Sequence, residues 1–155
     1  MNSNYYIPTA ACFKNVIDAI WQLDHFTSFH EEHIIPKGII EIIFNFSDSS
    51  PILTQLENTP YHLSNCFING FNTEPIRLQL PKQQVFFGIR FQPLAIKKIF
   101  GNPACEFADT TVDLTLIDPT FHSLWHQLAE RGEYDVERAA RETKTDQHAG
   151  GQVKC

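Results

Sequence analysis

Apolar and polar residues alternate along much of this chain, which is the pattern of half-buried antiparallel strands. The period of two is clearest over Pro75 to Leu80 and over Gln84 to Phe91. A more continuously apolar run, Ile39 to Phe46, follows a Pro36-Lys37-Gly38 turn that separates it from Phe29 to Ile35. The pattern predicts that the two runs on either side of this turn pair as a β-hairpin.

Shorter apolar segments with turn formers between them support the same interpretation. Cys66 to Asn69 is predicted to be a strand that Gly70 closes. Residues 10–23 fit both helical and strand spacing, and the pattern leaves both open there. Short strands with turn signals roughly every ten residues are typical of a sandwich or small barrel, and not of a parallel sheet with intervening helices.

The spacing becomes helical in the last third of the chain. Pro93 to Phe100 predicts a short helix that ends at Gly101. Asp118-Pro119 opens a clearer helix, whose apolar stripe consists of Phe121, Leu124, Trp125 and Leu128. We therefore predict an α+β fold that is mainly β with C-terminal helices: an antiparallel β-barrel or sandwich followed by a short helical segment.

Length and composition favour one globular unit with a tail. The chain has 155 residues, 43% of them hydrophobic, including 13 Phe, which is enough apolar surface for one core. Residues 1–130 form the predicted domain, with its helical segment from residue 93. Residues 131–155 are predicted to be the start of a linker helix and a disordered tail, since Thr143 to Cys155 is almost wholly polar.

The charge balance argues against nucleic acid as a direct partner. The formal net charge is −6, with 18 acidic against 12 basic side chains, whereas binding to phosphate backbones is driven by Lys and Arg. No apolar run approaches the roughly 20 residues that cross a bilayer, and Met1 to Pro8 lacks the features of a secretion signal. Four widely spaced cysteines suit reduced thiols. We expect a cytoplasmic protein with no membrane partner.

Histidines form two weak candidate metal sites. His30 lies near Glu32 and His33, but the strand period sends His30 and His33 to opposite faces. His122 and His126 share a helix face, yet no third ligand is evident nearby. No known nucleophile motif or phosphate loop is present. We expect no enzymatic activity, no metal and no cofactor, and we interpret these histidines as polar surface.

Two charges interrupt apolar runs and form a candidate ion pair. Glu41 and Arg90 offset each other's desolvation if their strands face one another, and the alternative is that both point to water from an exposed face. The apolar residues around them either fill a core or line a ligand pocket. The candidate pocket residues are Ile40, Ile42, Phe44, Phe87, Ile89 and Phe91.

Several short pieces, taken in order, resemble a known family. They are Ile35-Pro36-Lys37-Gly38, Glu41-Ile42-Ile43-Phe44-Asn45-Phe46, Phe67-Ile68-Asn69-Gly70, Gly88-Ile89-Arg90-Phe91-Gln92-Pro93, Phe107-Ala108-Asp109 and Val112-Asp113-Leu114. Their order over residues 10–130 resembles the cupin-like N-terminal domain, of the DUF6597 type, in AraC-type transcriptional regulators. The family pattern has an acidic residue where this chain has Lys37.

The resemblance implies an effector-sensing or dimerising domain, joined in family members to two helix-turn-helix units that bind DNA. The implied partners are a small-molecule effector and a second copy of the chain or a related regulator. We expect the chain to be truncated, or altered in frame, near residue 140 and to reach DNA only through a module that it lacks. The alternatives are a stand-alone ligand-binding or dimerisation partner of full-length regulators, and a small cupin-like metal-dependent enzyme using His30, Glu32 and His122 or His126.

Overall fold

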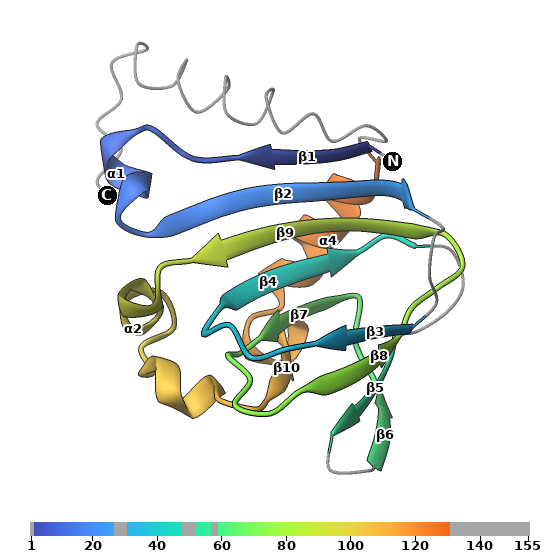
Figure 1. Cartoon of the computed structure of the whole chain (residues 1–155). Coiled ribbons are helices and arrows are strands. Elements are labelled where there is room, and N and C mark those ends of the chain that lie inside the picture. Colours follow the sequence, from blue (N-terminus) through green and yellow to red (C-terminus); the bar gives the residue numbers. More distant parts are fainter. Residues whose placement is uncertain (1, 27–30, 48–51, 57–58, 131–155) are drawn as a thin grey trace.

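The chain folds into two antiparallel β-sheets that pack against each other, with most of the helices in the C-terminal half of the sequence (Figure 1). The computed structural model describes residues 2–26, 31–47, 52–56 and 59–130. The fold is α+β, mainly β with C-terminal helices, and its two sheets give it a sandwich-like form. This confirms the fold class predicted from the alternating pattern.

Within the described residues, the larger sheet has six strands in the order β1-β2-β9-β4-β7-β10, and all neighbours are antiparallel. β9 and β4 lie at its centre, so their backbones are paired on both edges. Its strands are β1 (Asn2–Tyr6), β2 (Ile17–Phe26), β4 (Ile40–Asn45), β7 (Cys66–Asn69), β9 (Gln84–Phe91) and β10 (Thr111–Asp113).

The smaller sheet has the order β3-β8-β5-β6 in the part of the chain that the structure describes. The alternating pattern of β8 is visible in its burial, because Ile76 is buried whereas Arg77 and Gln79 are exposed. The inward residues of β8 therefore face the larger sheet. The strands of the smaller sheet are β3 (Glu31–Ile34), β5 (Leu53–Leu56), β6 (Thr59–His62) and β8 (Ile76–Gln79).

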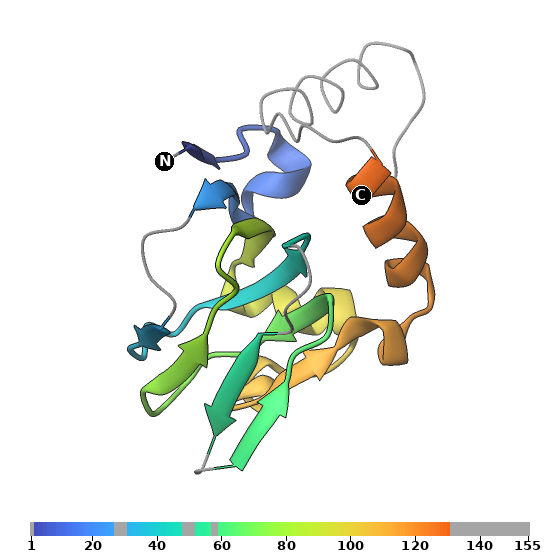
Figure 2. The same cartoon turned by 90° about the vertical axis from the view of Figure 1, so that its right-hand side faces the viewer.

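The helical segments follow mostly after β9. They are α1 (Ala11–Lys14), the 3₁₀ helices η1 (Pro93–Ala95) and η2 (Ala104–Phe107), α2 (Ile96–Phe100), α3 (Leu114–Ile117) and α4 (Thr120–Glu130). α2 ends at Gly101, whose φ of 78° is a left-handed conformation that glycine adopts without steric cost. Figure 2 shows α4 along one side of the molecule, with β5 and β6 at the end opposite β1.

The two faces of the larger sheet support two separate cores. The helix-side core packs α2, α3 and α4 on β4, β7 and β9; its fully buried members include Ile40, Phe44 and Ile96. The inter-sheet core lies on the opposite face, and its buried members are Ile52, Leu63, Phe67 and Phe86. From the predicted stripe of α4, Leu124 stays 39% exposed, whereas the other three residues pack on the helix-side core.

The hairpin predicted around the Pro36-Lys37-Gly38 turn is wrong. Both strands form, as β3 and β4, but β3 pairs with β8 in the smaller sheet, while β4 pairs with β7 and β9 in the larger one. The physical reason is burial. β4 is buried along most of its length and takes a central position with two partners, whereas β3 is mostly exposed. The turn, with Gly38 at φ 63°, carries the chain between sheets.

The region left open between helix and strand contains both, since α1 ends at Lys14 and β2 begins at Ile17. The strands at Cys66–Asn69, Ile76–Gln79 and Gln84–Phe91 agree with the predicted runs. β1, the β5–β6 pair and β10 were not predicted, because their residues show little alternation. The predictions for 131–155 lie outside the described residues.

Cys66 lies in the helix-side core, where it is 1% exposed. Burial, and secondarily the negative charge of Asp113, raises the pKa of the Cys66 thiol to about 12. We therefore expect iodoacetamide at pH 8 to alkylate the exposed Cys105 in the folded protein and to leave Cys66 unmodified until the chain unfolds. Peptide mass spectrometry measures both rates, and equal rates would contradict the buried position of Cys66.

Candidate functional site

A cavity of about 180 Å³ lies between the two sheets. Strands β2, β4, β7, β9 and β10 form one wall, and β3 and β8 form the other, with loop residues closing the sides. Its apolar lining consists of Trp21, Ile34, Ile43, Ile52, Leu63, Phe67, Ile76, Leu78, Leu80 and Phe86. Its polar lining consists of Glu32, Glu41, Asn69 and Thr111. Mostly apolar walls with a few polar groups are the usual composition of a small-molecule site.

Strand register sorts the larger sheet's wall into a polar row and an apolar row. The polar row crosses β9, β4, β7 and β10 and consists of Arg90, Glu41, Asn69 and Thr111, of which all but Arg90 line the cavity. The apolar row lies two residues away on the same face, crosses β2, β9, β4 and β7, and consists of Trp21, Gly88, Ile43 and Phe67. A molecule in the cavity therefore meets hydrogen-bonding groups at one end and apolar surface at the other.

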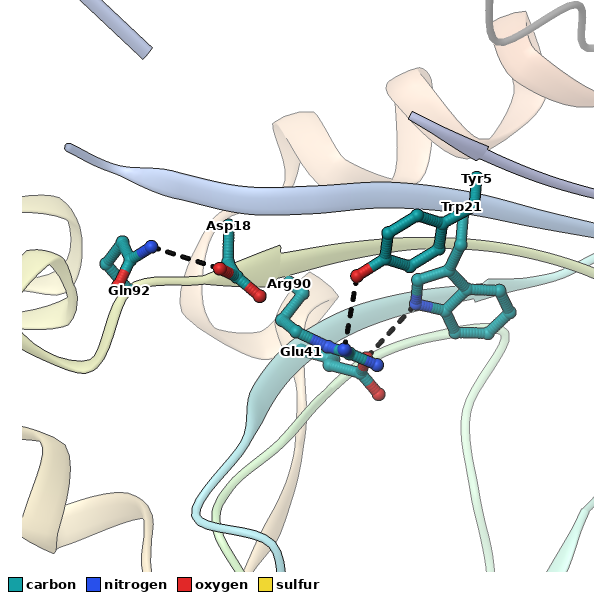
Figure 3. A network of polar contacts seen from close by, with 6 residues as sticks. All are labelled: Tyr5, Asp18, Trp21, Glu41, Arg90 and Gln92. Atoms are coloured by element: carbon teal, nitrogen blue, oxygen red, sulfur yellow. Dashed lines mark hydrogen bonds and ion pairs between the residues drawn. The ribbon is translucent and has the colours of Figure 1, made fainter. Parts of the chain in front are cut away.

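The structure brings Glu41 and Arg90 together as a directly opposed pair on β4 and β9 (Figure 3). Arg90 Nε donates to Glu41 Oε1 at 2.9 Å, and the side chains are 27% and 13% exposed, respectively. Arg90 Nη1 also donates to the Tyr5 hydroxyl at 3.4 Å. Such a pair offsets the cost of removing both charges from water, so the charges that interrupt the apolar runs compensate one another.

Trp21 completes this cluster from β2, which is not a neighbour of β4. Its Nε1–H donates to Glu41 Oε1 at 3.1 Å (Figure 3). The indole must cross β9 to reach β4, and it does so over Gly88, the residue paired with Trp21. A Cβ atom at position 88 would collide with Cε2, Cζ2 and Nε1 of the indole. The glycine is therefore what allows Trp21 to cover the strand and form one wall of the cavity.

Glu41 retains hydrogen-bonding capacity toward a ligand. Both of its hydrogen bonds, from Trp21 and from Arg90, use Oε1, and no described residue donates to Oε2. An ionised carboxylate has about four lone-pair sites. Glu41 also lines the cavity, so a bound molecule with a donor group can use the second oxygen.

Glu32 contributes a second carboxylate, from the opposite sheet. It lies on β3 and lines the cavity, although the residue as a whole is exposed, which places it at the mouth. Partial burial raises the pKa of the Glu32 carboxyl, the charge of Lys37 lowers it, and the charge of Glu41 raises it. Both carboxylates line the cavity, from opposite sheets, so their negative charges repel each other across it.

The six apolar residues proposed as pocket lining lie on the other face of the sheet. Ile40, Ile42, Phe44, Phe87 and Phe91 are buried in the helix-side core, and Ile89 packs against it. None of the six lines the cavity. In a strand, alternate residues face opposite ways, so residues adjacent in sequence to Glu41 and Arg90 point away from them. The residues that share the cavity face are those two positions away, such as Ile43 and Gly88.

The histidines do not assemble with the cavity. His122 and His126 lie on α4 with ring centroids 4.5 Å apart, and both are exposed. α4 packs on the helix-side core, so the structure does not bring Glu32 together with them. His30 lies outside the described residues. Within the described ranges, no group of three or more His, Cys, Asp and Glu side chains is placed to hold a metal ion.

Sequence reasoning missed Trp21, Asn69 and Thr111 as site residues. Their roles come from strand register, because Asn69 and Thr111 are opposed to Glu41 across β7 and β10. One usable signal was present in the sequence. A glycine inside an apolar strand, here Gly88, often marks close approach of another group.

Comparison with family models gives one match, to the family described as a domain of unknown function, DUF6597, over residues 5–113. The chain belongs to this family. No curated protein and no solved structure matches the chain. The DUF6597 match ends with β10, so it contains every residue that lines the cavity and leaves out α3 and α4. None of the helices in the described ranges is long and apolar enough to cross a membrane.

Proposed function

We propose that this chain is the regulatory, non-enzymatic domain of an AraC-type DNA-binding transcription factor, and that it binds a small effector in the cavity between its sheets. One observation carries the proposal: the cavity is apolar over most of its wall and has a single organised polar row. This composition suits reversible recognition of a small organic molecule. The resemblance to cupin-like regulatory domains supports the same function.

Some of the residues behind that resemblance lie at or beside the cavity. Glu41 and Ile43 come from one of the quoted pieces, Phe67 and Asn69 from a second, and Gly88 from a third. They come from three strands that are far apart in the sequence, yet they share one face of the larger sheet. Part of the similarity therefore lies at the cavity, and the same pieces also supply residues of the helix-side core, such as Phe44 and Ile68.

The proposed mechanism is a ligand-dependent change in association between copies of the domain. An effector shifts an equilibrium only if it binds one state more tightly, and a molecule between the sheets contacts both of them. Dimerisation is the readout that the family resemblance implies. Exposed apolar residues on α3 and α4, Leu116 at 83% and Leu124 at 39%, offer surface for such association.

A transcriptional reporter tests this proposal. The full chain is fused to a DNA-binding module that represses its reporter only as a dimer, and cells are exposed to a library of small metabolites. We expect at least one compound to change reporter output. Leu78→Trp, which fills the cavity from β8, should abolish the response, whereas Arg77→Trp, on the exposed face of the same strand, should preserve it.

Two results would contradict the proposal. One is a fusion that neither self-associates nor responds to any compound. The other is a response that survives in Leu78→Trp when this variant folds normally by circular dichroism, because the effector would then bind elsewhere.

A further inference from the structure

The charges around the cavity select a class of ligand. Two carboxylates line it, Glu41 from the larger sheet and Glu32 from the smaller one, and no described Lys or Arg is among the lining residues. Arg90, in the same polar row, compensates the negative charge of Glu41 through an ion pair with Glu41 Oε1. Glu32 has no such partner: Lys37 attracts its charge, but no ion pair joins these two side chains in the described part of the chain. The cavity thus carries uncompensated negative charge.

The polar row also has the hydrogen-bonding character that an ammonium group needs. An ammonium has three donors and no acceptor. Asn69 and Thr111 present oxygen acceptors in the same row as the second oxygen of Glu41. An anionic ligand would bring a third negative charge beside two carboxylates. A neutral apolar ligand would remove water from those carboxylates without replacing its hydrogen bonds, which is unfavourable.

The apolar row sets the size and shape of the rest of the ligand. Trp21 presents an indole face beside Glu41, and Ile43 and Phe67 continue the same surface. An indole face attracts cations as well as apolar groups. An apolar cavity of about 150 Å³ accommodates benzene, and this cavity measures about 180 Å³. One ring with a short chain fills it, and larger ligands must extend through the mouth.

We propose that the cavity binds a small monocyclic or similarly compact organic amine, with its ammonium group held between Glu41 and Glu32 and its apolar body on Trp21 and Ile43. This inference rests on the proposed function, because it names the ligand class of the same cavity. The amine makes its strongest contacts with carboxylates from both sheets. Binding of the amine therefore holds the two sheets together more firmly than binding of the same apolar group without the ammonium.

A matched set of three probes tests the charge requirement on the full chain: 2-phenylethylamine, 2-phenylethanol and phenylacetate, titrated at pH 7 by isothermal calorimetry. They share a ring and differ in the charge of one end. We expect the amine to bind at least about tenfold more tightly than the alcohol, since hydrogen bonds to charged groups are the stronger ones, and we expect no measurable binding of phenylacetate.

Variants assign the effect to the two carboxylates. Glu41→Gln should weaken binding of the amine about tenfold or more. Glu32→Gln should weaken it about threefold, because Glu32 lies at the mouth and is better solvated. Neither change should weaken the binding of 2-phenylethanol. Glu31→Gln is the matched control: the same charge is removed from the neighbouring position on β3, where Glu31 pairs with Arg77 outside the cavity, and the amine affinity should not change.

The inference is overturned if the alcohol or phenylacetate binds as tightly as the amine, or if none of the three binds at millimolar concentration. Glu32→Gln keeps the test decisive if Glu41→Gln does not fold. In the reporter assay of the proposed function, a response to anionic or neutral compounds alone would reject the amine and leave the regulatory function standing. If the reporter responds to no compound but the amine binds tightly, the regulatory function would be rejected and the amine site would stand.

Discussion

Replacing Gly88 with alanine is expected to destabilise the protein by about 3 kcal/mol and to abolish ligand binding in the cavity. The new methyl group occupies the space of the Trp21 indole, because a Cβ at position 88 collides with three atoms of the ring. Overpacking of this kind costs about 1–3 kcal/mol, and displacing the ring also breaks its hydrogen bond to Glu41, worth about 1 kcal/mol. Urea denaturation followed by circular dichroism measures the loss.

The double variant Trp21→Ala with Gly88→Ala is the control for this explanation. Trp21→Ala alone removes the ring that the new methyl group strikes, so adding Gly88→Ala should cost little more. The two changes should therefore be strongly non-additive, as expected for groups in direct contact. Additive effects would mean that Gly88→Ala acts through something other than the indole, and the account of this wall would be wrong.

Removing Glu41 is the second large effect that we expect. Glu41→Ala leaves the Arg90 guanidinium without its carboxylate partner, and the Trp21 N–H without its acceptor. Breaking a fully buried pair costs about 3–5 kcal/mol. Arg90 keeps 27% of its side chain exposed, which lowers the expected loss, and we expect about 2 kcal/mol in the free energy of unfolding measured in urea.

A double-mutant cycle separates the ion pair from the rest of this loss. Glu41→Ala, Arg90→Ala and the double variant should give a coupling energy of about 1–2 kcal/mol. The exposed pair Glu31–Arg77, with Nε to Oε1 at 3.1 Å and side chains 49% and 55% exposed, is a matched Glu–Arg control. Its coupling should stay below about 1 kcal/mol. Equal coupling in the two cycles would contradict the role assigned to burial.

Local pattern was enough to predict most of the central strands. β7, β8 and β9 follow directly from apolar alternation bounded by Gly and Pro, and α4 follows from its stripe and its Asp118-Pro119 start. The pairing of strands was not accessible in the same way. A tight turn between two apolar runs favours a hairpin, but β4 lies at the centre of the larger sheet and takes its partners from residues 66–69 and 84–91 instead.

The site was predictable to the extent that it depends on single unusual residues. Glu41 and Arg90 stood out because charges interrupt apolar runs, and the structure places them opposite one another. The rest of the site depends on which residues share a face. A shift of one position in a strand exchanges the two faces, and so six apolar residues of β4 and β9 remained candidates for a pocket lining although they belong to, or pack on, the helix-side core.

The central claim is that the cavity between the sheets, and not the helix-side face, is where a ligand binds. The two tryptophans of the chain test it directly, since one lies on each face of the larger sheet. Trp21 Nε1–H donates to Glu41 in the cavity. Trp125 lies on α4, on the other face, and its Nε1–H donates to the Asn45 carbonyl oxygen at 2.9 Å. Each indole N–H gives a separate nuclear magnetic resonance signal.

The measurement is a titration of the ¹⁵N-labelled full chain with 2-phenylethylamine, followed at the two indole N–H signals and assigned with Trp125→Phe. The account predicts that the Trp21 signal shifts in a saturable way, while the Trp125 signal does not move. Movement of the Trp125 signal with an unchanged Trp21 signal, or no movement of either, would contradict it.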